Sequence, residues 1–298
     1  MIKKMENKMN VLSLFDGMSC GQLALQKSNI KYDKYFASEI KQNAIKLTQH
    51  HFPNTIQLGD VRNINLSALP KIDLLIGGSP CQDFSSANTK QLGLQGKKSI
   101  LFYEYLRILK ELKPKYFLLE NVRMKKESEK QLNKYLGVIG MHINSTLVSY
   151  QRRARIYWTN LPTQNTLLKD RNINFQDYKD TNYEYCKLFK VNKTPSRIKM
   201  WNNGNGFNGI GNCHNITHAK KIYCLTRKQD RSPNSGLIAF DDFCRFLTRR
   251  ELEQAQCVPA GYTNLVSYNQ AQDLLGDGWT IDVVSHILKE GFKKGMEK

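Results

Sequence analysis

The chain lacks three sequence patterns, and each absence excludes a class of protein. No apolar run approaches the ~20 residues that a membrane-spanning helix needs, and the first ten residues lack the apolar core of a secretory signal. The seven cysteines are odd in number and irregularly spaced, which is typical of free thiols in a reducing compartment. These absences predict a cytoplasmic protein without structural disulfides.

Acidic residues are also scarce. There are 26 Asp and Glu against 45 Lys and Arg, which gives a net charge of +19. Such an excess is typical of proteins that bind polyanions, although a generally lysine-rich proteome would produce it too. The 298 residues, of which 40% are hydrophobic, can form one large domain and a smaller one.

The most informative stretch is 72–85, where an apolar run leads into a loop with a cysteine. Its length predicts a buried strand of a parallel sheet. We expect Gly77-Gly78 to end the strand and allow a tight turn, and Pro80 to fix the backbone beside Cys81. Ligands bind at the carboxyl ends of such strands. A nucleophilic Cys81 fits this place, and a buried, inert cysteine is the alternative.

The remaining periodic segments predict an α/β fold with a mostly parallel sheet and helices on both faces. Further strands are expected at 10–15, 33–39, 55–59, 115–122, 143–149 and 151–158. Helices are expected at 22–27, 101–109, 246–255, 270–275 and 281–289, with Thr248 and Glu251 as a capping box and a turn at 276–279.

Several strands end in charged residues. Glu39 and Asp60 follow the second and third strands, where acids accept hydrogen bonds from a nucleotide or cap the next segment. Glu120 comes directly after the apolar run in the strand 115–122 and needs either a partner or a ligand. Alternation along 151–158 would place Gln151, Arg153 and Arg155 on one face, beside a ligand or as charges that guard a sheet edge.

Residues 162–242 differ in character, because Asn, Lys, Gly and Tyr dominate and apolar periodicity nearly vanishes. We interpret 1–161 as a catalytic and cofactor domain, 162–242 as a small irregular domain, and 243–298 as a segment that returns to the first domain. Cys213, His214, His218 and Cys224 match no standard zinc spacing, so we expect no metal.

Five stretches, in chain order, resemble the DNA (cytosine-5) methyltransferases, and the Leu-Phe-Asp-Gly form is similar to the branch that includes the animal de novo enzymes. They are Phe15-Asp16-Gly17-Met18, Glu39 with Asp60, Pro80-Cys81-Gln82, Glu120-Asn121-Val122 and Gln151-x-Arg153-x-Arg155. Residues 245–251 and 276–279 resemble the two C-terminal motifs of the family. Residues 162–242 correspond to its variable target-recognition region.

The resemblance implies a Rossmann-like fold and transfer of a methyl group from S-adenosylmethionine to a flipped-out cytosine in double-stranded DNA. It implies that Cys81 is the nucleophile, that Glu120 holds the ring, that Arg155 contacts the base and that Arg153 supports the loop. The implied substrate residues are Gln82, Ser85, Asn121 and Gln151. The implied cofactor residues are Phe15, Asp16, Gly17, Met18, Ser19, Glu39, Ile40, Asp60, Val61, Pro80, Leu101, Asp277 and Trp279.

The sequence departs from the family pattern at Ser13, at Ser19-Cys20 and at 276–279, which leaves the contact of Asp277 open. Transfer to a cytosine of transfer RNA, or a catalytically inactive DNA-binding relative, are the alternative functions. We expect a monomer, associated with the nucleoid if the source is prokaryotic or viral. Whether a cognate restriction endonuclease accompanies it stays open.

Overall fold

The computed structural model describes residues 9–79, 100–163, 168–192, 194–195, 215–229 and 235–296. The chain divides into two compact units, which are described separately below. The first comprises 1–143, 154–166 and 284–298, and the second comprises 144–153 and 167–283. The predicted boundaries after 161 and 242 separate regions by their expected roles, and they stay predictions.

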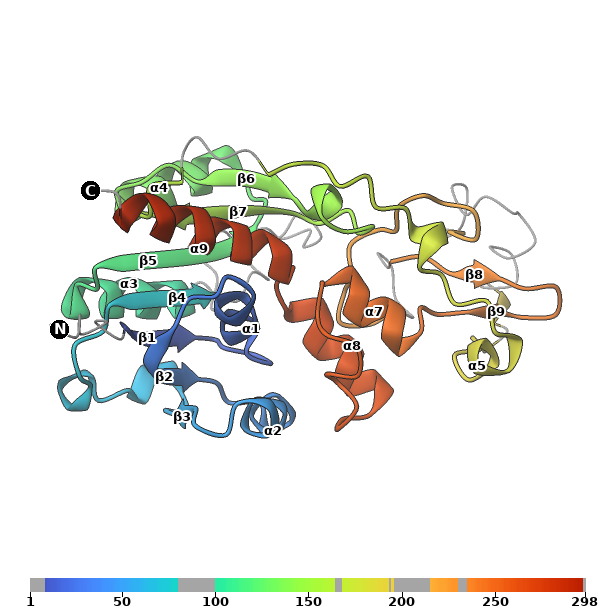
Figure 1. The fold of residues 1–298 in the computed structure, drawn as a ribbon, viewed down its shortest axis with the longest axis horizontal. Coiled ribbons are helices and arrows are strands. Elements are labelled where there is room, and N and C mark those ends of the chain that lie inside the picture. The colour runs from blue at the N-terminus through green and yellow to red at the C-terminus, as the bar shows by residue number, and fades with distance from the viewer. Residues whose placement is uncertain are drawn as a thin grey trace, which may run out of the picture. The chain divides into compact units, whose positions relative to one another are not determined.

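The first unit is built on a seven-stranded sheet with the order β3-β2-β1-β4-β5-β7-β6 (Figure 1). Its strands are β1 (Met9–Leu14), β2 (Tyr32–Ser38), β3 (Ile56–Gln57), β4 (Leu74–Gly78), β5 (Tyr116–Val122), β6 (Met141–Asn144) and β7 (Ala154–Thr159). The pairs from β3 to β5 are parallel, and β7 runs antiparallel to β5. Because parallel strands end at one edge, the carboxyl ends of β1, β2 and β4 and the end of β5 lie together.

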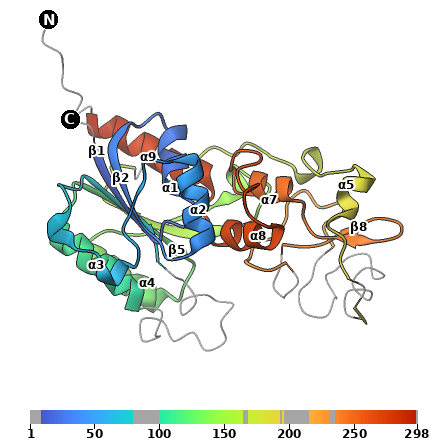
Figure 2. The same cartoon turned by 90° about the horizontal axis from the view of Figure 1, so that it is seen from below.

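Helices cover both faces of this sheet (Figure 2). One face carries α1 (Cys20–Lys27), α2 (Gln42–His51) and α9 (Ile281–Met296), and the other carries α3 (Ile100–Leu112) and α4 (Lys126–Leu136). Short 3-10 turns at Val61–Asn63 and Leu66–Ala68 contact α3. The mostly parallel sheet and its two helical layers confirm the predicted fold class.

The core explains why apolar runs rather than alternating patterns mark the central strands. Leu12, Leu75, Leu119, Phe102 and Trp158 are all buried in one hydrophobic cluster of the first unit. Strands of a parallel sheet are covered on both faces, so most side chains of β1 and β4 are apolar. Each such side chain contributes about 1.5–3 kcal/mol by leaving water.

Gly77 has a different role from the predicted one. Strand β4 ends at Gly78, as predicted, but both glycines still belong to the strand and pair with β5, Gly77 opposite Leu119 and Gly78 opposite Glu120. A Cβ atom on Gly77 would lie 3.0 Å from the Tyr105 ring and 3.1 Å from the Leu14 carbonyl oxygen. Glycine is therefore needed for close packing of β4 rather than for a turn.

Two predicted strands around residue 150 were wrong in extent. Strand β6 ends at Asn144, whose side chain accepts hydrogen bonds from the backbone N–H groups of Thr146 (3.2 Å) and Arg153 (3.1 Å). This cap starts a 3-10 turn at Ser145–Leu147. Strand β7 begins only at Ala154, so Gln151 and Arg153 precede it and do not share a strand face with Arg155.

The second unit contains shorter elements than the first. They are the 3-10 turns Ser145–Leu147 and Phe175–Asp177, α5 (Tyr183–Lys187), β8 (Ile238–Ala239), β9 (Cys244–Arg245), α7 (Arg249–Ala255) and α8 (Tyr268–Asp277). The predicted capping box at Thr248 and Glu251 is confirmed. The predicted turn at 276–279 begins later than expected, since Gly276 and Asp277 still belong to α8.

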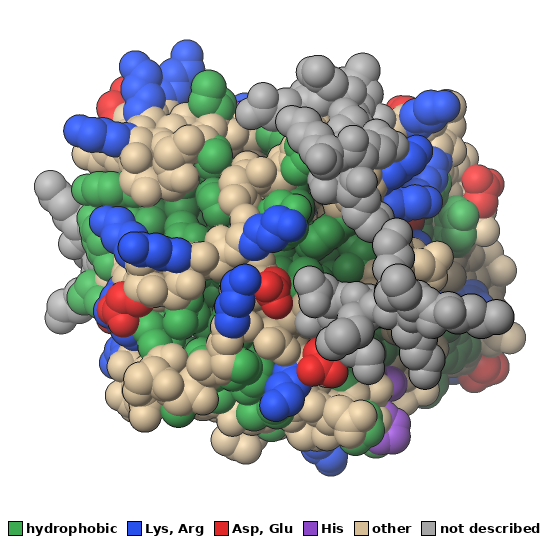
Figure 3. Space-filling model, turned by 60° about the vertical axis from the view of Figure 1, so that its left-hand side comes forward, with side chains coloured by type: hydrophobic (Ala, Val, Ile, Leu, Met, Phe, Trp, Pro, Cys, Tyr) green, Lys and Arg blue, Asp and Glu red, His purple; other side chains and the backbone are tan. Residues whose placement is uncertain are grey.

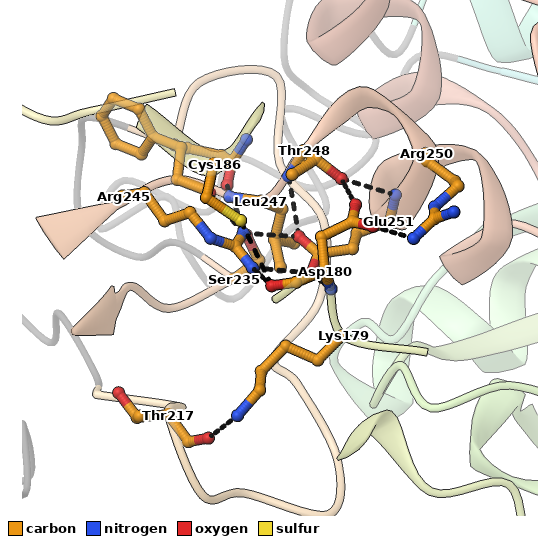
Figure 4. A network of polar contacts seen from close by, with 12 residues as sticks. Lys179, Asp180, Cys186, Thr217, Ser235, Arg245, Leu247, Thr248, Arg250 and Glu251 are labelled. Carbon is orange, nitrogen blue, oxygen red and sulfur yellow. Dashed lines mark hydrogen bonds and ion pairs between the residues drawn. The ribbon is translucent and has the colours of Figure 1, made fainter. Parts of the chain in front are cut away.

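A buried ion pair organises the second unit (Figure 4). The side chains of Arg245 and Glu251 are both 0% exposed and form two hydrogen bonds of 2.7 and 2.9 Å. Arg245 also donates to the backbone carbonyl of Asp180 at 2.8 Å, and Glu251 accepts from the Asp180 N–H at 2.8 Å. Because buried charges are stable only when paired, β9, α7 and the segment around Asp180 depend on one another.

Candidate active site

The loop between β1 and α1 has a strained backbone. Phe15, Gly17 and Ser19 have φ angles of 58°, 58° and 62°, in the left-handed region that residues other than glycine rarely adopt. Apart from the adjoining residues Asp16 and Met18, no described atom lies within 4 Å of the position that a Cβ atom on Gly17 would take. Strain of this kind persists where the surroundings enforce it, commonly at binding sites. The loop therefore combines a fixed backbone with open space beside Gly17.

Hydrogen bonds bring the three predicted cofactor segments together. The Asp16 N–H donates to the Ser38 carbonyl (3.1 Å), and the Ser38 hydroxyl donates to the Gly59 carbonyl (2.8 Å). The Gly17 N–H donates to the Glu39 carboxylate at 2.8 Å. Three segments that are distant in the sequence thus meet at one edge of the sheet.

Glu39 and Asp60 both already have protein partners. Glu39 accepts from the N–H groups of Ile40 and Lys41 at 2.8 and 2.9 Å, while the Ile40 side chain is 66% exposed. Asp60 accepts from the side chain and the backbone N–H of Arg62, which lowers the pKa of its carboxyl group. Asp60 thus caps the 3-10 turn Val61–Asn63, which is one of its two predicted roles, whereas Glu39 binds backbone N–H groups just before α2 and does not cap that helix. A carboxylate has about four acceptor positions, so a ligand can still bind to either one.

Asp16 is the buried carboxyl group of the loop. It is 7% exposed, and its Oδ1 accepts a hydrogen bond of 2.8 Å from the Tyr35 hydroxyl group. Its Oδ2 is buried and accepts no hydrogen bond from the described part of the chain. Burial raises the pKa of Asp16 to about 6, against the lowering effect of the Ser13, Tyr35 and Ser19 hydroxyl groups.

The other predicted cofactor residues differ in exposure. Met18, Ser19, Val61 and Trp279 are buried. Phe15 and Leu101 are partly buried and pack against the core of the first unit. Asp277 lies in the second unit, half-exposed, with its carboxylate 3.6 Å from the Arg227 guanidinium group. The binding roles of these residues stay predictions.

At the end of β5, Glu120 and Arg155 form an ion pair. The Arg155 Nε lies 2.9 Å from the Glu120 Oε1, and the two side chains are 13% and 10% exposed. The antiparallel register causes this meeting, since Val122 pairs with Arg155 and Glu120 with Tyr157. The structure therefore joins two of the four predicted catalytic side chains and leaves both with limited contact to solvent.

Asn121 connects this pair to the loop that follows β4. Its side-chain amide donates to the Ser79 hydroxyl (3.0 Å) and the Ser79 carbonyl (3.3 Å), and Asn121 is 1% exposed. Ser79 is the last described residue before Cys81. Cys81 itself lies outside the described residues, as do Pro80, Gln82 and Ser85. The sequence thus places the predicted nucleophile two residues beyond a fixed anchor.

Gln151 and Arg153 belong to the second unit, whereas Arg155 belongs to the first. The Arg153 guanidinium group donates to the carbonyl groups of Leu225 (3.1 Å), Gly276 (3.1 Å) and Gly278 (2.8 Å). Gln151, which is fully buried, donates to the Ala255 carbonyl at 2.8 Å and accepts from the Leu225 N–H at 2.9 Å. Both side chains hold separate segments of the second unit together.

The described residues contain no group of three or more His, Cys, Asp and Glu side chains that could hold a metal ion. Likewise, no helix in the described ranges is long and apolar enough to cross a membrane.

A family model for C-5 cytosine-specific DNA methylases matches residues 9–157, which is half of the chain and includes the Phe15 loop, Glu120 and Arg155. The chain belongs to the C-5 cytosine-specific DNA methylase family. The loop between β1 and α1 and the Glu120–Arg155 pair both lie within the segment that the family model matches.

The match with similar methylases covers only part of each of those proteins. An orphan methyltransferase of Bacillus phage rho11s, M.Rho11sI, is 40% identical over 119 residues, or 39% of this chain and 24% of that protein. The type II methyltransferase M.NgoBV of Neisseria gonorrhoeae is 33% identical over 170 residues, or 50% of this chain and 40% of that protein. The match thus spans well under half of the curated relatives.

Solved structures extend the likeness in fold across the chain. The Entamoeba histolytica methyltransferase EhMeth has a TM-score of 0.78 and 15% identity, and the match covers 97% of this chain and 99% of that one. The Dnmt2 methyltransferase of S. pombe has a TM-score of 0.67 and 16% identity, with 96% and 99% covered. At these identities the likeness concerns the fold alone.

Two features of this methylase-family chain were missed by reasoning from its sequence. Tyr35 donates to Asp16, and Ser79 accepts from Asn121. Both contacts join neighbouring strands of the sheet or its edge loops. Tyr35 begins the buried part of strand 32–38, and its hydroxyl group was the available signal for the first contact, while nothing in the sequence specifies the partner of Asn121.

Proposed function

We propose that the chain is a DNA methyltransferase that transfers a methyl group from S-adenosylmethionine to carbon 5 of a cytosine. The Glu120–Arg155 ion pair carries this proposal, because it sits in the family segment at the sheet edge where Asn121 anchors Ser79. A carboxyl group and a guanidinium group held side by side can contact neighbouring polar atoms of one planar base.

The chemistry required of the chain follows from the weak nucleophilicity of cytosine carbon 5. The Cys81 thiolate adds to carbon 6, so that carbon 5 becomes part of an electron-rich enamine. Glu120 holds nitrogen 3 of the ring, where negative charge would otherwise develop, and Arg155 donates to the carbonyl oxygen at position 2. After methylation, loss of the proton from carbon 5 expels Cys81 and restores the aromatic ring.

The described loop residues fit the predicted cofactor. Open space lies beside Gly17, the Asp16 Oδ2 has no described partner, and the acids Glu39 and Asp60 stand at adjoining strand ends. Carboxylates accept hydrogen bonds from ribose hydroxyl groups and from amino groups. When bound, S-adenosylmethionine supplies an electrophilic methyl group.

Double-stranded DNA is the proposed substrate. Lys and Arg side chains recur across the face shown in Figure 3, in keeping with the net charge of +19. Such charge binds phosphate groups without regard to sequence, whereas base edges must be read by other contacts. We assign that readout to residues 162–242. The target cytosine must leave the stack to reach a thiol.

Bisulfite sequencing of DNA from cells that express the chain tests the activity and reveals the methylated sequence together. DNA carrying 5-fluorocytosine should yield a protein–DNA adduct that resists denaturation and requires S-adenosylmethionine, since fluorine does not leave as a proton does. Cys81→Ser should abolish the adduct and methylation while duplex binding persists. Cys257→Ser, at a partly buried thiol in the second unit, should leave trapping intact.

Three outcomes would contradict the proposal. A full adduct from Cys81→Ser would place the nucleophile elsewhere. Methylation of transfer RNA without methylation of DNA would replace the substrate, and duplex binding without any methyl transfer would indicate an inactive relative. Exchange of 162–242 with the same region of a relative should change the methylated sequence, and an unchanged sequence would locate the readout outside it.

A further inference from the structure

Asp16 is a costly residue to place where the structure has it. Asp16 is 7% exposed, its Oδ1 accepts from the Tyr35 hydroxyl at 2.8 Å, and its Oδ2 is buried without a hydrogen-bond partner among the described residues, although the Ser13 and Ser19 hydroxyl groups also stabilise the ionised form. A buried charge without adequate partners is unfavourable, so the site must either hold a proton or gain a positive charge from a ligand.

The groups around Asp16 supply no positive charge. Tyr32 and Tyr35 of β2 stay neutral, because burial raises the pKa values of their hydroxyl groups. Glu39, at the end of β2, adds a like charge that also raises the pKa of Asp16. The remaining polar neighbours are the hydroxyl groups of Ser13 and Ser19. Among the described residues, no cation acts on the pKa of this carboxyl group.

The place of Asp16 in the chain connects this carboxyl group with the proposed cofactor. Asp16 stands between Phe15 and Gly17, and its N–H group joins the loop to the Ser38 carbonyl at 3.1 Å. S-adenosylmethionine carries a permanent positive charge on its sulfonium group. Its product, S-adenosylhomocysteine, has a neutral thioether at the same position, so the two ligands differ in charge as well as in one methyl group.

We propose that Asp16 is a specificity-determining residue whose carboxylate favours the sulfonium donor over the thioether product, which makes the ratio of their affinities depend on pH. This rests on the proposed function, since it requires the loop to bind that cofactor. Below about pH 6 the carboxyl group is largely protonated and neutral, so the discrimination weakens. By linkage, donor binding near pH 6 releases a fraction of a proton, and product binding releases less.

The test is isothermal titration of the full chain with each ligand between pH 5 and 7, in buffers of different ionisation enthalpy. We expect the preference for S-adenosylmethionine to increase about fivefold over this range, the lower end for coupled sites. Asp16→Asn should make the preference independent of pH. Asp33→Asn, an exposed carboxylate at the start of β2, is the matched control and should behave like the wild type.

A second variant guards against an Asp16→Asn protein that does not fold. Tyr35→Phe removes the hydroxyl group that lowers the pKa of Asp16, so the pH at which the preference changes should rise. Equal weakening of both ligands by Asp16→Asn would show a purely structural role and overturn the inference, as would an unchanged pH profile. If the wild type binds neither ligand, the proposed function itself fails.

Discussion

Asp16 should make the folded protein less stable at neutral pH than at acid pH, and its replacement by Asn should remove that dependence. The carboxyl group has a pKa of about 6 in the folded chain against 3.8 for an ordinary Asp. Between these values the folded state binds more protons than the unfolded state. The free energy of unfolding therefore falls as the pH rises from about 4 to 6, and it changes little above that range for this group.

The magnitude follows from the two pKa values. A difference of about two pH units corresponds to about 3 kcal/mol, because each unit is worth 1.36 kcal/mol. The Asn side chain brings an NH2 group that needs a partner in the buried site, which costs about 1–3 kcal/mol at every pH. Part of the titration lies below pH 4.5, so the difference between Asp16→Asn and the wild type should shift in favour of the variant by about 2 kcal/mol between pH 4.5 and 7.5.

Urea unfolding at half-unit steps from pH 4.5 to 7.5, followed by circular dichroism, would measure this shift. The cost of burying the Asn amide is the same at every pH, so it does not affect the change in the free energy of unfolding with pH, which is the quantity compared. Asp33→Asn is the control, since Asp33 is exposed on the same strand as Tyr35 and should show no comparable trend. A pH-independent difference between Asp16→Asn and the wild type would refute the argument that burial dominates the titration of Asp16.

Four further outcomes can be checked. Glu251→Gln should destabilise the chain by about 3–5 kcal/mol in urea unfolding, since Arg245 would stay buried without its counter-charge. A loss of stability below about 1 kcal/mol would contradict this. Glu39→Ala should weaken S-adenosylmethionine binding by about 1–3 kcal/mol in titration calorimetry, and unchanged affinity would remove Glu39 from the site. Asn121→Ala should lower the methylation rate much more than the affinity for S-adenosylmethionine, because it removes the hydrogen bond to Ser79, two residues before Cys81. An equal fall in the rate and the affinity would refute this. Duplex affinity should fall steeply with salt, and a flat dependence would mean that the positive charge does not face DNA.

Local patterns in the sequence specified most of the fold. Apolar runs that end in Gly or acidic residues marked the strands, and helical spacing marked α3 and α9, because burial on both faces of a sheet or on one face of a helix leaves a periodic trace. The capping box of Thr248 and Glu251 was equally visible, since both of its hydrogen bonds lie within four residues. The order of the motifs also indicated the family, which the comparison with known proteins confirmed.

Tertiary structure alone decided which of the predicted site residues meet. Gln151 and Arg153 looked equivalent to Arg155 in the sequence. In the structure the Arg153 N–H group binds the Asn144 side chain and β7 begins only at Ala154, so that of these three side chains Arg155 is the one that pairs with Glu120. The burial of Asp16 likewise depends on strands that are distant in the chain. Short-range spacing records helix and strand periodicity, whereas ion pairs, close approaches and desolvation arise from contacts between segments whose separation the sequence does not encode locally.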